Sequence, residues 1–293
     1  MRGLAASQEE ERMMTANSAE DKNTPYILVA PNGARRTAAD HPAIPVTMDE
    51  IVETARACQR AGAHGVHVHV RDANGQHSLD AGSYRETVAE LHRVAPGLDV
   101  QITTEAAGIF DVPAQLACLE QVQPDWASIS IREIARDPDL APRVYALCAD
   151  QGTRVQHILY DAEDARLLDQ WQRDGIVQAN QTDRLLVLGR YSEGQQSVPA
   201  DLDAFPDCPN RWMICAFGTQ EHACLTEAAR RGGDVRVGFE NSLTGPDGTP
   251  WADNAASVAA LVELLGKAKT GVTYSRATPN QICPSRQVGM AVI

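Results

Sequence analysis

The chain has 293 residues, 22% charged side chains and a formal net charge of −13 at pH 7. This length suits one large domain or two ordinary ones. The negative charge disfavours binding to nucleic acid or to an anionic membrane surface. The sequence has no signal-peptide core and no apolar run that could span a membrane, and its seven cysteines form no C-x-x-C pair. We therefore expect a cytoplasmic protein with reduced thiols, without a disulfide framework or a cysteine-based zinc site.

Eight short β-rich runs alternate with helical patterns along the chain. The runs cover residues 26–30, 65–70, 100–104, 126–131, 155–160, 185–189, 212–217 and 234–239. Helical periodicity is clear at 47–61 and 252–265. Eight strand–helix units predict an α/β fold, a single-domain (β/α)8 TIM barrel over residues 25–268, closed in chain order. We expect a flexible tail at 1–24, and at 269–293 either an arm against a neighbouring subunit or a disordered tail.

The second β-rich run carries two histidines that are two residues apart. In the segment Gly65-Val66-His67-Val68-His69-Val70, strand alternation directs His67 and His69 to one side and the valines to the other. Valines covered by helices place the histidines inside the barrel. Two neutral imidazoles on one face can share a metal ion; the alternative is that each is an ordinary core residue. His64 is expected to be a loop residue and not a further ligand.

The eighth run supplies a carboxylate close to these histidines. Arg236, Gly238 and Glu240 alternate with apolar residues, so Arg236 and Glu240 share the inner face and Glu240 is nearest the mouth. Strands one, two and eight are neighbours in a closed barrel, which lets Glu240 approach His67 and His69. Two histidines and one glutamate leave an open position on a zinc-like ion, as in catalytic sites, where the ion acts as a Lewis acid.

Polar residues also collect at the other strand ends, where TIM barrels build their active sites. Arginine binds planar carboxylates and phosphates through two parallel hydrogen bonds, so several arginines at one rim predict an anionic ligand. The alternative is that they form salt bridges with Asp72, Glu105, Glu133 and Asp161. The polar strand-end residues are Thr103, Thr104, Glu105, Ser128, Ser130 and Arg132, and the further rim arginines are Arg35, Arg36, Arg71 and Arg190.

Several motifs together resemble the β-keto acid cleavage enzyme family, from about residue 26 to residue 265. They are Asn32-Gly33-Ala34, Asp40-His41-Pro42 to Pro45-Val46-Thr47, His67 to Asp72, Gln101-Ile102-Thr103-Thr104, Leu186 to Gly189, and Gly232 to Asn241. The resemblance implies a zinc-dependent barrel that exchanges acyl groups between a β-keto acid and acetyl-CoA by retro-Claisen chemistry, giving acetoacetate and a new acyl-CoA. It also implies a homo-oligomer, with a tetramer as the expected state.

The resemblance assigns roles to individual residues. It implies that His67, His69 and Glu240 hold one Zn²⁺ and that Arg236 lies beside the catalytic base. Thr103 stands where the family has a serine that positions this base, and Ser128 replaces a substrate-binding threonine. At the predicted mouth we also expect Arg35, Thr104, Ser130 and Arg132 to contact substrate.

Two departures from the family pattern affect the base and the substrate. Asn241 follows Glu240 where the family's namesake has the aspartate proposed as base, and an amide cannot take a proton at neutral pH. Glu105 is the preferred substitute because it shares the inward parity of Thr103; a metal-bound hydroxide is the second choice. Arg35 and Ile158 replace two glutamates, which predicts a substrate with a neutral or anionic far end, such as a keto diacid or an aromatic-acid breakdown product.

Two other functions are compatible with the same residues. A metal-dependent carbon–carbon lyase or hydrolase could use the His/His/Glu site without CoA, and no phosphate-cradling glycine-rich loop marks a CoA site. Acetyl-CoA therefore follows only from the resemblance. A non-catalytic metal-binding barrel is the second alternative, because Asn241 stands where the namesake has an acid.

Overall fold

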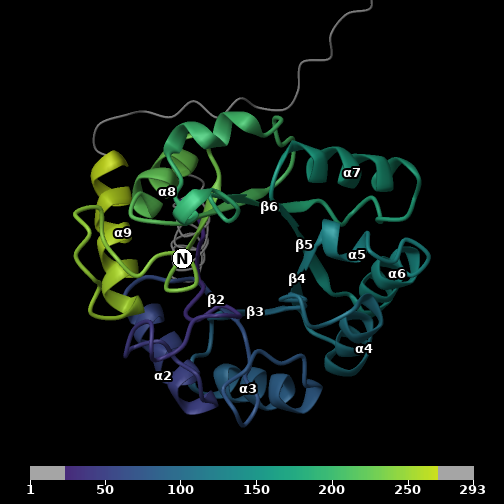
Figure 1. Ribbon diagram of the computed structural model, residues 1–293, viewed down its shortest axis with the longest axis horizontal. Helices are drawn as coiled ribbons and strands as arrows, with labels where there is room; N and C mark the ends of the chain where they lie inside the picture. Colours follow the sequence, from purple (N-terminus) through teal and green to yellow (C-terminus); the bar gives the residue numbers. More distant parts are fainter. Residues whose placement is uncertain (1–23, 270–293) are drawn as a thin grey trace, which may run out of the picture.

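The computed structural model describes residues 24–269, in which eight parallel strands close into a barrel in chain order (Figure 1). β1 pairs with both β2 and β8, which completes the ring. The predicted TIM barrel and its eight strands are confirmed, whereas nearly all of the expected tail and extension lies outside the described residues. The strands are β1 Ile27–Val29, β2 Gly65–Val68, β3 Asp99–Thr103, β4 Trp126–Ser130, β5 Arg154–Leu159, β6 Asp183–Leu188, β7 Trp212–Ala216 and β8 Asp234–Val237.

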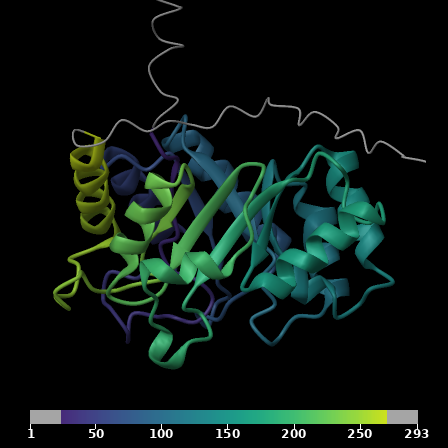
Figure 2. The same ribbon diagram turned by 90° about the horizontal axis from the view of Figure 1, so that it is seen from above.

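Helices surround the barrel on its outside (Figures 1 and 2). The two predicted helices are present as α2 and α9; α2 begins at Thr47, which forms a reciprocal capping box with Glu50. Among residues 24–269, no helix is both long enough and apolar enough to cross a lipid bilayer. The helices are α2 Met48–Arg60, α3 Ala81–Val94, α4 Val112–Val122, α5 Ile131–Ile134, α6 Ala141–Gln151, α7 Ala162–Arg173, α8 Glu221–Arg230 and α9 Asn254–Lys269, with 3-10 turns η1 Glu193–Gln195 and η2 Pro199–Ala204.

Two apolar layers stabilise the fold. The larger one lies between the sheet and the helices and includes the valines of β2 that alternate with the histidines. The smaller one fills part of the barrel interior. Its buried members are Leu28, Trp126, Ile158, Leu185, Val187, Met213, Cys215 and Phe217. The apolar interior thus comes mainly from β5, β6 and β7, which leaves the interior near β2, β3 and β8 for polar side chains.

Candidate active site

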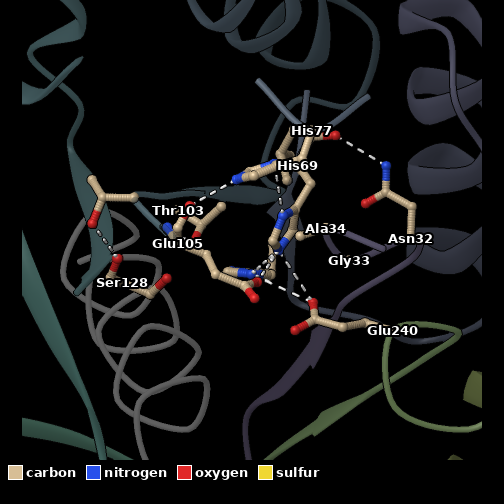
Figure 3. A network of polar contacts seen from close by, with 12 residues as sticks. Asn32, Gly33, Ala34, His69, His77, Thr103, Glu105, Ser128 and Glu240 are labelled. Atoms are coloured by element: carbon tan, nitrogen blue, oxygen red, sulfur yellow. Dashed lines mark hydrogen bonds and ion pairs between the residues drawn. The ribbon is translucent and has the colours of Figure 1, made fainter. Parts of the chain in front are cut away.

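The three predicted metal ligands lie together at the carboxyl end of the barrel, and Figure 3 shows two of them, His69 and Glu240. His67 is on β2, His69 directly follows that strand, and Glu240 comes three residues after the end of β8. The two histidine Nε2 atoms are 3.1 Å apart, and Glu240 Oε2 lies 3.5 Å from each of them. Gly33 makes room for the glutamate, because a Cβ at Gly33 would lie 2.6 Å from Glu240 Cγ. The sequence-based grouping of these three residues is therefore matched by the geometry.

A chain of amides orients the ring of His67. Its Nδ1 lies 2.7 Å from Gln101 Oε1, and the Gln101 amide donates to Gln156 Oε1 at 3.0 Å. Because the Gln101 oxygen can only accept, His67 Nδ1 carries the proton and its Nε2 lone pair faces the site. Burial and the nearby Arg236 hold the pKa of His67 well below its usual value, so this imidazole is neutral.

A second chain of hydrogen bonds orients His69 through His77. His77 Nε2 lies 2.8 Å from the backbone oxygen of Glu105, and the Nδ1 atoms of His77 and His69 are 3.5 Å apart (Figure 3). Burial lowers the pKa of His77 to about 3, so its ring is neutral. It must donate from Nε2 to the carbonyl, which leaves its Nδ1 as an acceptor for His69 Nδ1–H. The Nε2 lone pair of His69 is consequently directed toward Glu240 and His67.

Glu240 is ionised, and one of its carboxylate oxygens has no hydrogen-bond partner among the described residues. Burial raises the pKa of Glu240, but the guanidinium of Arg236, 2.9 Å from Oε1, outweighs this effect and holds the pKa well below its usual value. The other oxygen, Oε2, has no hydrogen-bond partner within the described chain and faces both imidazoles. Two nitrogen lone pairs and one carboxylate oxygen that converge on one point fit a divalent transition ion such as Zn²⁺.

A pocket adjoins this site. Glu105 reaches into it, with Oε2 3.9 Å from His69 Nε2 and Oε1 3.6 Å from Arg190 Nη2. Thr103 Oγ1 accepts a hydrogen bond from the backbone N–H of Glu105 at 3.0 Å and so fixes the start of the loop that carries it. One side of the pocket is polar and the other is apolar. Its lining is His67, Thr103, Glu105, Ile158, Tyr160, Val187, Arg190, Phe217, Arg236 and Glu240.

Several buried polar groups at this end of the barrel have no partner. The hydroxyls of Ser128 and Ser130, the Nε and Nη1 atoms of Arg236 and the side-chain amide of Asn241 make no hydrogen bond to the described residues. Buried polar atoms normally have partners, because burying one without a partner costs about 1–3 kcal/mol. Of these groups, Arg236 lines the pocket, so its two unpartnered nitrogens are donors that a polar ligand there can reach.

None of the five predicted substrate-binding residues is in the lining of this pocket; they are Arg35, Thr104, Ser128, Ser130 and Arg132. Arg35 is exposed and has no hydrogen bond or ion pair to residues 24–269. Thr104 is buried directly after β3, where its hydroxyl donates a hydrogen bond to the backbone oxygen of Ser128 at 3.4 Å. Arg132 pairs with Asp161, as the salt-bridge alternative for the arginines anticipated, and also with Asp164.

The sequence reasoning did not select Gln101 or His77 for the site, and it named Arg190 only as one of the rim arginines. Gln101 could have been found, because it has the inward parity of Thr103 on the same strand. His77 lies in the loop after β2 and reaches the site through an isolated antiparallel bridge to Arg71, which no local pattern predicts. His64, in contrast, accepts a hydrogen bond from the N–H of Ile27 at the start of β1, as expected for a residue outside the metal site.

A sequence profile of the beta-keto acid cleavage enzyme family matches residues 25–281. The chain belongs to this family. It is 26% identical over 272 residues to a 3-oxoadipate:acetyl-CoA acetyltransferase of Cupriavidus necator, covering 86% of this chain and 93% of that protein. It is also 22% identical over 247 residues to a 3-keto-5-aminohexanoate cleavage enzyme of Fusobacterium nucleatum, covering 81% of this chain and 90% of that protein.

Solved structures share the fold of this β-keto acid cleavage family member. ObcA in its apo form superposes with a TM-score of 0.58 at 18% identity over 78% of this chain, which spans only 63% of the ObcA chain. The 3-dehydroquinate dehydratase of Geobacillus kaustophilus superposes with a TM-score of 0.55 at 11% identity, covering 85% of this chain and 93% of that one. At these identities the likeness concerns the barrel alone.

Proposed function

We propose that this family member is a zinc-dependent enzyme that transfers acyl groups between a β-keto acid and acetyl-CoA, giving acetoacetate and a new acyl-CoA. The observation that carries the proposal is the convergence of two imidazole lone pairs and the unpartnered Glu240 oxygen beside a pocket with a carboxylate, Glu105. The acetyltransferase of Cupriavidus necator, whose name gives this type of reaction, supports the proposal.

The metal ligands and Arg236 supply the electrostatic part of the chemistry. A zinc ion held by His67, His69 and Glu240 would supply a Lewis acid for a keto oxygen. Arg236 is buried, hydrogen bonds to Glu240, and keeps two guanidinium nitrogens without partners. It can therefore stabilise negative charge that develops on the substrate when the carbon–carbon bond breaks.

Glu105 is the residue that we assign as general base. Its carboxylate lines the pocket within 3.9 Å of a metal ligand, and Thr103 holds its backbone. It can remove a proton from the carbon between the keto group and the carboxylate of a β-keto acid. Asn241 cannot take this role, because an amide does not accept a proton at neutral pH and the residue is not part of the pocket lining.

The pocket favours a substrate whose far end is neutral or anionic. Opposite the metal ligands, Ile158, Val187 and Phe217 form an apolar wall. Arg190 also lines this pocket, and its guanidinium would repel a cationic far end. A wider groove shares Tyr160, Val187 and Arg190 with the pocket, and it offers the long acyl carrier a route to the reacting groups.

The experiment is an assay of the zinc-loaded protein with a panel of β-keto acids, with and without acetyl-CoA. We expect acetoacetate and the matching acyl-CoA in equal amounts, detected by mass spectrometry, only when both substrates are present. Product without acetyl-CoA would instead support a lyase or hydrolase. Tight ligand binding without turnover across the panel would support a non-catalytic metal-binding barrel.

A further inference from the structure

Arg190 occupies a distinctive position between the pocket and the wider groove. It comes two residues after β6 ends, lines both spaces, and its side chain is only 14% exposed. Its guanidinium carbon lies 5.1 Å from the ring centre of Phe217. The cation is therefore held at the end of the pocket and not in bulk solvent.

The guanidinium of Arg190 is less occupied than those of the neighbouring arginines. Arg71 donates to backbone carbonyls of the loop after β1, Arg36 donates to those of Phe239 and Asn241, and Arg132 donates to two aspartates. Arg190 contacts Glu105 at 3.6 Å, which exceeds a hydrogen bond, and its guanidinium makes no hydrogen bond to residues 24–269. A mostly buried guanidinium with free donors is a site prepared for an anion.

We propose that Arg190 binds a second carboxylate at the far end of the substrate, so that the preferred substrate is a β-keto dicarboxylate. This inference rests on the proposed function, which places the keto acid end of the substrate at the metal ligands. The apolar wall of Ile158, Val187 and Phe217 suits the methylene groups between the two ends. The planar guanidinium can receive the far carboxylate through two parallel hydrogen bonds.

In this proposal Arg190, and not Arg35 as the sequence suggested, is the residue that determines substrate specificity. Arg35 was the residue expected to select the far end of the substrate, but it is exposed and lies outside the pocket lining. Arg190 provides the same positive charge from inside the pocket. Because its contact with Glu105 is longer than a hydrogen bond, a substrate carboxylate can replace that contact at little cost.

The test compares 3-oxoadipate with 3-oxohexanoate, which have the same six-carbon chain and differ in a carboxylate against a methyl group. We expect kcat/KM for 3-oxoadipate to exceed that for 3-oxohexanoate, and Arg190→Gln to lower the ratio of the two values by roughly 10- to 100-fold. Arg190→Lys should retain part of the preference. Arg154→Gln is the control, because Arg154 pairs with Asp183 at the opposite end of the barrel; it should preserve the ratio of the two values.

A binding measurement separates this proposal from the proposed function. Adipate and hexanoate are unreactive ligands of the same length, and calorimetry on the zinc-loaded protein should show adipate binding that Arg190→Gln weakens roughly 10- to 100-fold. Arg190-dependent adipate binding without turnover of any keto acid would support the subsite and refute the proposed function. Turnover of both keto acids with a ratio that Arg190→Gln leaves unchanged would support the function and overturn the subsite.

Discussion

The two halves of the barrel interior differ in how they hold their side chains. Near β2, β3 and β8, hydrogen bonds fix His67 through Gln101, His69 through His77, and Glu240 through Arg236. Near β5, β6 and β7, the interior is filled by apolar residues such as Ile158, Val187 and Met213. Hydrogen bonds are directional and fix the orientation of each side chain, whereas apolar contacts are non-directional and determine only the shape of the pocket. The first half can therefore perform chemistry, and the second can select among substrates.

The largest effect should come from removing a metal ligand in the polar half. His67→Ala should reduce bound zinc far below one ion per chain and lower turnover by at least roughly 10³-fold, because Lewis-acid stabilisation is worth several kcal/mol. Elemental analysis measures the zinc content, and the acyl-transfer assay measures the turnover. His92→Ala, on the exposed face of α3, is the matched control and should change neither. Full metal content and activity in His67→Ala would show that His67 is not a metal ligand.

The next effect concerns the base at the border of the two halves. Glu105→Gln should lower kcat by roughly 10²- to 10⁴-fold, because the amide cannot accept a proton. Zinc content should stay unchanged, since Glu105 is not one of the three convergent ligands. Steady-state kinetics and elemental analysis on the same sample check both points. Intact turnover with bound zinc would assign proton removal to another group.

A smaller effect is expected where one hydrogen bond orients a ligand. In His77→Asn the amide oxygen can replace Nδ1 as the acceptor for His69, whereas in His77→Gln the amide nitrogen can replace only the Nε2 donor to Glu105. Zinc affinity should fall roughly 10- to 100-fold in His77→Gln and less in His77→Asn. Competition with a chromophoric chelator measures it. Equal loss in both variants would mean that His77 fills space and does not orient His69.

The smallest effect concerns the loop that carries Glu105. Glu133 accepts hydrogen bonds from Ala106 N–H and the Gln115 amide, and burial raises the pKa of Glu133 from 4.5 to about 7. Because this pKa is higher in the folded state, the contribution of Glu133 to stability is present below pH 4.5 and is lost as pH rises through 7.

Glu133→Gln removes this pH dependence while retaining an acceptor oxygen. It should therefore increase the free energy of unfolding by about 1–2 kcal/mol at pH 8, and by less as the pH approaches 4.5. Urea unfolding at pH 8 and pH 5 measures the difference. A gain of the same size at both pH values would show that the carboxyl does not titrate between them.

The fold and the metal ligands could be predicted because each depends on local periodicity. Alternation along β2 placed His67 and His69 on one face, and closure in chain order brought β8 beside β1. Arg190 and His77 lie in loops, where no periodicity tells whether a side chain points inward. Arg35 and Arg132 were predicted to contact substrate because each lies near a strand end. In the structure, Arg35 is exposed to solvent and Arg132 forms salt bridges with two aspartates.

The hydrogen bonds around the two imidazoles have a consequence for demetallation. Gln101 and His77 hold the rings through their Nδ1 atoms, so the protein itself, and not an ion, keeps the Nε2 atoms in place. Stripping with a chelator should then leave a folded apoprotein with an unaltered circular dichroism spectrum. Adding zinc back should restore activity without a refolding step. Metal binding at this site would then be reversible and would not be required for folding.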